Sequence, residues 1–244
     1  YAWLPEERVA VVEMASASGL PLLSKAQRAP LRTNTFGAGQ VLRAAMRRGP
    51  AKILLTLGGS ATVDGGVGAA AALGWTFFDE VGRSFVPAGG TLERVQSVHP
   101  PDGRDNWPAF EALCDVTNPL CGPNGAAAVY GPQKGASPND VERLERGLAS
   151  LADCVKHDLN VDIRDLPGAG AVGGFGGGAV AFLGAELVRG IEAVAATCGL
   201  RNALADADWV VTGEGKFDAQ SLQGKVVDGV KAVADACGAR VAVL

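Results

Sequence analysis

Short apolar runs alternate with alanine-rich stretches along this chain, and the alternation indicates the fold class. Runs rich in β-branched residues or leucine predict strands at Val9–Met14, Lys52–Leu57, Ala112–Val116, Asp208–Thr212 and Arg240–Leu244. Alanine-rich stretches predict helices at Gly39–Arg48, Gly66–Leu73, Asn139–Lys156, Gly176–Leu187 and Gly224–Cys237. Strands that alternate with helices are typical of a mostly parallel sheet covered by helices, so we expect an α/β fold.

Three local patterns refine this expectation. Ser137 and Pro138 precede an acidic first turn, which predicts a capped helix start with proline at its first position. Residues 77–95 contain two apolar segments around glycine turns, which predicts a hairpin and a second, mixed lobe. Leu159, Val161 and Ile163 alternate with polar residues, which predicts a half-exposed strand before Pro167.

Three of the expected strands lead into loops rich in glycine and polar residues. These loops are "GGSATVDGG" (58–66), "CDVTNPLCGPNGAAAVYGPQKGA" (114–136) and "VTGEGKFDAQSLQGK" (211–225). In open α/β sheets ligands bind beyond the carboxyl ends of the strands, so the loops mark the expected site.

The loop 58–66 combines anion-binding groups with one acid. The backbone N–H groups of Gly58 and Gly59, with the hydroxyls of Ser60 and Thr62, are suited to a carboxylate or a phosphate. Asp64 cannot hold the same anion, so it is expected either to bind a cation or a substrate hydroxyl, or to cap the helix that begins near Gly66. The sequence leaves these two roles of Asp64 open.

The other two loops add further polar candidates. The second contributes Asp115, Asn118, Gln133 and the cation of Lys134, which is either an anion ligand or a solvated surface lysine. The third offers carboxylates and lysines around one glycine-rich turn, a combination suited to phosphoryl transfer. Its candidates are Glu214, Lys216, Asp218, Gln220 and Lys225.

The segment "PGAGAVGGFGGG" (167–178) contains the G-x-G-x-x-G spacing of a dinucleotide-binding turn at Gly168, Gly170 and Gly173. A buried apolar strand should precede such a turn, whereas here the preceding residues alternate and end in Pro167. We therefore favour glycines that let a helix approach another backbone closely, and an NAD-linked oxidoreductase is the weaker alternative.

Composition restricts the classes of partner. The 244 residues carry a net charge of −4 without a basic tract, which argues against a nucleic-acid partner. No apolar run reaches the roughly 18 to 20 residues of a membrane span. Five cysteines without a C-x-x-C pair favour reduced thiols in a cytoplasmic protein. The start at Tyr1 and the end in an apolar run predict a piece of a longer protein, and a homo-oligomer stays open.

The three loops, in this order, resemble the bacterial glycerate kinase family. Further matching stretches are "EMASASGLPLL", "NTFGAGQVL" and "PGAGAVGGFGGGAVAFLGAEL", so the resemblance covers nearly the whole chain. It implies ATP-dependent, Mg²⁺-assisted phosphorylation of D-glycerate to 2- or 3-phosphoglycerate by a two-lobed cytosolic α/β enzyme. It also implies that residues 1–205 form an inserted mixed α/β lobe. Residues 206–244 would then form part of an incomplete Rossmann-like lobe, because both terminal segments of the family are missing here.

From this resemblance and the loop positions we expect a glycerate hydroxyl to attack the γ-phosphate of ATP. Asp64 or Asp218 would orient or deprotonate the hydroxyl, Lys134 or Lys225 would steady the developing charge, and Glu214 would serve a metal or water network. Two departures stand out, because Val63 replaces a usual asparagine and Lys216 a commoner arginine. A non-catalytic ligand-binding lobe is a third reading for a chain that lacks both ends.

Overall fold

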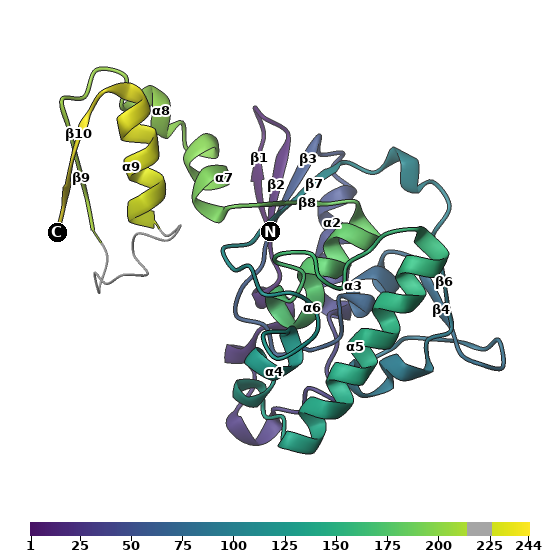
Figure 1. The fold of residues 1–244 in the computed structure, drawn as a ribbon. Helices are drawn as coiled ribbons and strands as arrows, with labels where there is room; N and C mark the ends of the chain where they lie inside the picture. Colours follow the sequence, from purple (N-terminus) through teal and green to yellow (C-terminus); the bar gives the residue numbers. More distant parts are fainter. Residues whose placement is uncertain (214–225) are drawn as a thin grey trace. The chain divides into compact units, whose positions relative to one another are not determined.

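The computed structural model describes residues 1–213 and 226–244, which form two compact units, Tyr1–Leu187 and Val188–Leu244 (Figure 1). The first unit holds a five-stranded sheet in the order β1-β2-β3-β7-β8 and a three-stranded sheet in the order β5-β4-β6, and the second holds the pair β10-β9. The strands are β1 (Ala2–Leu4), β2 (Val9–Glu13), β3 (Lys52–Thr56), β4 (Thr76–Phe78), β5 (Ser84–Phe85), β6 (Ser97–His99), β7 (Ala109–Leu113), β8 (Glu186–Val188), β9 (Trp209–Thr212) and β10 (Arg240–Val243).

Helices connect most of these strands. The α-helices are α1 (Ala15–Ser18), α2 (Phe36–Met46), α3 (Val67–Ala72), α4 (Ala126–Tyr130), α5 (Pro138–Leu159), α6 (Ala171–Gly178), α7 (Gly190–Thr197), α8 (Leu200–Ala203) and α9 (Val226–Cys237). Short 3-10 helices cover Leu20–Leu22, Lys25–Gln27, Gly89–Arg94, Arg104–Asn106 and Pro132–Lys134, and a π-helix covers Ala179–Leu183. Within the described residues, no helix combines the length and apolarity needed to cross a bilayer.

The centre of the larger sheet is parallel. β2 pairs in parallel with β3, and β3 in parallel with β7, whereas β1 runs antiparallel to β2 at the edge. Ile53, Leu54 and Leu55 are consecutive and all buried, as expected for a parallel strand covered on both faces. The α/β fold with a mostly parallel, helix-covered sheet is therefore confirmed.

Four of the five expected strands are found within one residue at each end, but the expected strand at Ala112–Val116 is displaced. β7 instead begins at Ala109 and ends at Leu113, because Ala109 pairs with Lys52 of β3. The charged Glu111 interrupts the apolar run and hides this start. Its carboxylate is satisfied by the Lys52 ammonium of the neighbouring strand, 2.8 Å away.

Helix α5 begins as expected and ends where a strand was expected. Ser137 accepts a hydrogen bond from the Asp140 N–H, the Asp140 carboxylate accepts one from the Ser137 N–H, and Pro138 occupies the first turn. The helix runs to Leu159, and Asn160 ends it in the left-handed conformation. The half-exposed strand through Val161 is therefore wrong. Its apolar residues belong to a helix end and to the loop that packs against the core beside α5.

The helix expected at Gly176–Leu187 begins earlier and ends earlier. α6 starts at Ala171, inside the glycine run, and continues through the π-helix to Leu183, where Gly184 takes a positive φ of 66°. The remaining residues lead into β8, an edge strand that the alanine-rich pattern did not reveal. The hairpin is confirmed, because β4 pairs antiparallel with β5.

The second unit has a small core of its own. β9 and β10 pair in parallel, and Val210 of β9 packs with Leu204, Ala234 and Ala239. The sequence pattern predicted β9, β10 and α9, whereas the short helices α7 and α8 were missed. Residues 214–225, which contain most of the third loop, lie outside the described residues.

Candidate active site

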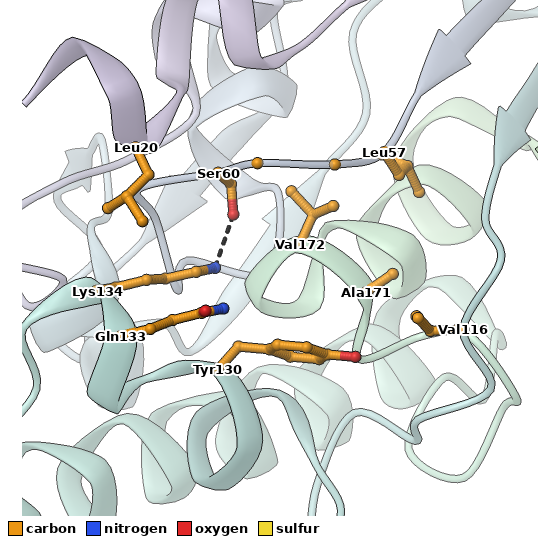
Figure 2. A pocket seen from close by; sticks show the side chains of 11 residues that line it. Leu20, Leu57, Ser60, Val116, Tyr130, Gln133, Lys134, Ala171 and Val172 are labelled. Atoms are coloured by element: carbon orange, nitrogen blue, oxygen red, sulfur yellow. Dashed lines mark hydrogen bonds between the residues drawn. The ribbon is translucent and has the colours of Figure 1, made fainter. Parts of the chain in front are cut away.

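A pocket of about 340 Å³ lies beyond the carboxyl ends of β3 and β7, where the loop sequences predicted a site (Figure 2). Four segments enclose it: the 3-10 helix Leu20–Leu22, the loop after β3, the region from the end of β7 to the 3-10 helix Pro132–Lys134, and the start of α6. The lining residues are Leu20, Leu57, Gly58, Gly59, Ser60, Val116, Tyr130, Gln133, Lys134, Ala171 and Val172.

The loop after β3 brings backbone donors to the pocket. In the part of the chain that the structure describes, the N–H groups of Gly58, Gly59 and Ser60 have no hydrogen-bond acceptor. The loop is held in place because the Leu20 N–H donates to the Gly59 carbonyl at 2.7 Å and the Ala61 N–H to the Ser18 carbonyl at 2.9 Å. Consecutive N–H groups without acceptors form a concave site for an anion.

Lys134 supplies the positive charge of the pocket. Its side chain is 2% exposed, and its ammonium donates to the Ser60 hydroxyl and to the Thr62 carbonyl, each at 2.7 Å. Figure 2 shows the Lys134 side chain reaching toward Ser60 from the segment that also carries Gln133 and Tyr130. An ammonium has three protons, so one N–H is left for a ligand. The reading of Lys134 as a solvated surface lysine is therefore wrong.

Burial also changes the acidity of this lysine. Loss of hydration lowers the pKa of Lys134 to about 7, although the charge of Asp64 acts in the opposite direction. With a pKa of about 7, the lysine is therefore about half protonated at neutral pH, and the charge of Asp64 keeps its pKa from falling further.

Asp64 lies beneath the loop and does not line the pocket. Its carboxylate is fully buried and accepts hydrogen bonds from the Thr35 N–H at 2.7 Å, the Thr35 hydroxyl at 2.8 Å, the Gly68 N–H at 3.1 Å and the Gly66 N–H at 3.3 Å. Burial raises the pKa of Asp64, and these hydrogen bonds oppose the rise. The helix-capping interpretation is confirmed, because Asp64 holds the starts of α2 and α3 together.

Tyr130 and Gln133, which lie on the same segment as Lys134, also line the pocket with polar groups. The Tyr130 hydroxyl donates to the Asn118 side-chain oxygen at 2.7 Å, and the Asn118 amide donates to the Asn124 carbonyl at 2.8 Å. Asn118 therefore positions Tyr130 without lining the pocket itself. The Gln133 side chain extends into the pocket beside Lys134 (Figure 2).

The glycine run allows α6 to pack directly on the loop that carries Ser60 and Asp64. A Cβ atom on Gly173 would lie 2.1 Å from the Thr62 carbonyl oxygen, and one on Gly170 would lie 2.1 Å from the Pro119 carbonyl oxygen. Within the described residues no strand lies between the end of α5 and Gly168, so the run does not form the strand–turn–helix of a dinucleotide site. The close-approach interpretation of these glycines is confirmed.

The structure brings together five of the predicted site residues, namely Gly58, Gly59, Ser60, Gln133 and Lys134. Thr62 contributes its carbonyl, while its buried hydroxyl has no partner among the described residues. Asp115 follows the end of β7 and is not among the lining residues. Val63 packs in the core of the first unit, away from the pocket. Glu214, Lys216, Asp218, Gln220 and Lys225 lie outside the described residues.

Several pocket residues were not predicted from the sequence. Tyr130 and Val172 lie inside quoted motifs, but both read there as ordinary helix or core residues. Leu20, Leu57 and Val116 are apolar, and nothing in their local pattern separates a pocket wall from a core position. In residues 1–213 and 226–244 no group of three or more His, Cys, Asp or Glu side chains is arranged to hold a metal ion.

Comparison with known proteins agrees with this geometry. A curated glycerate kinase of Halalkalibacterium halodurans is 42% identical over 92% of the chain, and the glycerate 2-kinase of Escherichia coli K12 is 43% identical over 90%. The alignments cover 60% and 58% of those relatives, so the chain spans about three fifths of their length.

A solved structure points to the same group of proteins. It comes from Salmonella typhimurium LT2, is provisionally named glycerate kinase 2, and superposes with a TM-score of 0.90 at 44% identity. The match covers 99% of this chain and 65% of that one. The model of the glycerate kinase family matches residues 1–244, and this chain therefore belongs to the glycerate kinase family.

Proposed function

We propose that the protein containing this chain transfers the γ-phosphoryl group of ATP to D-glycerate and yields a phosphoglycerate. The buried Lys134 beside the open N–H groups of Gly58–Ser60 carries the proposal, since together they form a binding site for an anion. Family membership selects glycerate and ATP among the anions that such a site could take. The name of the Escherichia coli relative favours the 2-phosphate as the product.

Phosphoryl transfer requires that the protein position the two substrates and stabilise the negative charge of the transferred group. A glycerate hydroxyl oxygen forms a bond to the γ-phosphorus, the bond from that phosphorus to the bridging oxygen breaks, and ADP leaves. Charge that develops on the transferred group is stabilised by fixed donors in a site shielded from water. We assign to Lys134 and the loop N–H groups both the binding of the glycerate carboxylate and part of this charge stabilisation, with Gln133 and Tyr130 as additional polar contacts.

Asp64 acts in this proposal as a positioning residue. It does not line the pocket, and its charge supports the protonated form of Lys134. The hydroxyl proton is then left for Asp218, with Lys225, Glu214 and Gln220 as its neighbours in the third loop, all outside the described residues. Mg²⁺ accompanies ATP in the proposal and would neutralise phosphate charge, and we assign it no ligand among the described residues. We place the enzyme in the cytoplasm.

The test is phosphorylation of D-glycerate by the full-length protein with Mg²⁺-ATP, measured as ADP release, with the product identified by phosphorus NMR. Lys134→Met should lower kcat/KM at least about a hundredfold, because one preorganised charged donor is removed. Lys156→Met is the matched control, since Lys156 is exposed and pairs with Asp162 on the surface.

Each variant is checked for a cooperative melting transition, and Lys134→Arg provides a second variant that keeps the charge. Absence of ADP release from the folded wild-type protein, or unchanged kcat/KM in a folded Lys134→Met variant, would refute the proposal.

A further inference from the structure

Val172 lines the pocket in a backbone conformation that valine rarely adopts. Its φ is 58° and its ψ is 38°, in the left-handed region, where a β-branched side chain crowds its own backbone. Gly173 and Gly174 follow with φ of 69° and 92°, and glycine is the residue expected there. Among the described residues, the other non-glycine residues with positive φ are Arg8 and Asn160, neither of which is β-branched.

A glycine at position 172 would fit this backbone without strain, so the valine side chain needs another explanation. Figure 2 shows Val172 rising from the start of α6 toward the loop that carries Ser60, on the side of the pocket that faces Lys134. β-branching restricts rotation about χ1, so the two methyl groups form a rigid surface. Leu20, Leu57 and Val116 also line the pocket, but none has a positive φ.

The geometry points to Val172 as the residue that limits the size of the acid accepted beside the Lys134–Ser60 pair. On this inference, three-carbon hydroxy acids are accepted between Val172 and the anion donors, and acids with one more hydroxymethylene group are disfavoured by contact with the valine methyl groups. The inference rests on the proposed function, because it names the substrate class of that same pocket.

The first experiment compares D-glycerate with D-erythronate, which keeps the carboxylate and 2-hydroxyl and adds one carbon. For the full-length enzyme, the ratio of kcat/KM for erythronate to that for glycerate should rise about tenfold or more in Val172→Ala and Val172→Gly. Val172→Ile should lower kcat/KM for glycerate. Val180→Ala is the matched control, because Val180 lies in the following π-helix, is similarly half-buried and does not line the pocket. A ratio that stays within about twofold in all Val172 variants overturns the inference.

A second experiment separates this inference from the proposed function. Calorimetric titration without ATP measures the dissociation constants of both acids for the wild-type protein and the Val172 variants. If glycerate binds selectively and the selectivity falls in Val172→Ala, but no phosphate is transferred, the proposed function is wrong and the inference about Val172 is supported. If erythronate binds the wild-type protein as tightly as glycerate, or if neither acid binds, the inference that Val172 limits the size of the acid is refuted.

The backbone strain has its own readout. Val172→Ala keeps a Cβ atom in the left-handed region and Val172→Gly removes it, so the glycine variant should melt about 2 °C or more above the alanine variant. At Val180 the order should be reversed, because alanine favours a helix over glycine. A glycine variant at 172 that melts below the alanine variant would show that Val172 is not strained.

Discussion

The Lys134 ammonium donates two of its three N–H groups to Ser60 and Thr62, which leaves one N–H group to bind a ligand in the pocket. The group must be charged to attract an anion, yet burial lowers its pKa to about 7, well below the ordinary 10.5. Between these two pH values the unfolded chain binds the proton more tightly than the folded protein does. Consequently, the contribution of Lys134 to the free energy of unfolding rises as pH increases from about 7 to 10.5.

Ligand affinity should follow the opposite trend. Above pH 7 the free protein loses the charge of Lys134, so the dissociation constant for D-glycerate should increase, approaching tenfold per pH unit. Titration calorimetry between pH 6 and 9 measures this slope. Lys134→Arg keeps its charge throughout and should give a flat profile. A wild-type profile as flat as that of the arginine variant would show that Lys134 does not bind the ligand.

Single residues also show which parts of the site could be predicted from the sequence. Gly58, Gly59 and Ser60 were predicted because glycines and hydroxyls directly after an apolar strand have few uses besides binding and turning. Lys134 could not be distinguished from a surface lysine, since its burial depends on the Ser60 and Thr62 acceptors more than seventy positions away in sequence. The sequence shows Val172 among glycines, but its positive φ could not be predicted because tertiary packing determines it.

At the scale of elements, the contact between α6 and the loop after β3 is built from backbone against backbone. Gly173→Ala places a Cβ atom 2.1 Å from the Thr62 carbonyl oxygen and should destabilise the protein by about 3 kcal/mol or more. Gly103→Ala is the matched control, because Gly103 has a φ of 75° and no atom within 4 Å of the new Cβ. It should cost about 1 kcal/mol, the price of the left-handed conformation alone.

Urea unfolding of both variants measures the difference. Equal losses in the two variants would show that the left-handed backbone, rather than the close approach of α6 to the loop, makes glycine necessary at position 173.

The elements that the pattern predicted well are those with a single dominant signal. β2 and β3 are continuous apolar runs, and α5 has both a capping box and an amphipathic surface. The misplaced elements each contain a conflicting residue. Glu111 interrupts β7, and glycines open α6, so local preference opposed the tertiary contacts that finally decide the structure.

At the scale of the whole molecule, the chain accounts for about three fifths of its curated relatives. The assignment of residues 1–205 to an inserted lobe and 206–244 to a Rossmann-like lobe stays a prediction, as does the alternative of a lobe that binds without catalysis. The argument for an α/β protein needed only the alternation of strand-like and helix-like runs along the sequence, whereas nothing in that pattern fixes where one lobe ends and the next begins.

Thermal unfolding of the full-length protein with separate ligands tests the assignment of the whole molecule. D-glycerate and Mg²⁺-ATP, each at about a hundred times its Kd, should each stabilise the folded state by about 2.7 kcal/mol. NAD⁺ should leave the melting temperature unchanged, because the glycines of 168–173 pack against backbone. A shift with NAD⁺ alone would favour the oxidoreductase alternative, and a glycerate shift without turnover would favour a binding lobe.

The donors at Gly58, Gly59 and Ser60 belong to the main chain, and this has a consequence for how the site tolerates genetic change. Replacing a side chain leaves its N–H group in place, so an alanine scan would not measure what these donors contribute, and at Gly59, whose φ is 64°, it would add backbone strain instead. Substitution by proline, which deletes the N–H, or by an ester bond through chemical synthesis would expose it.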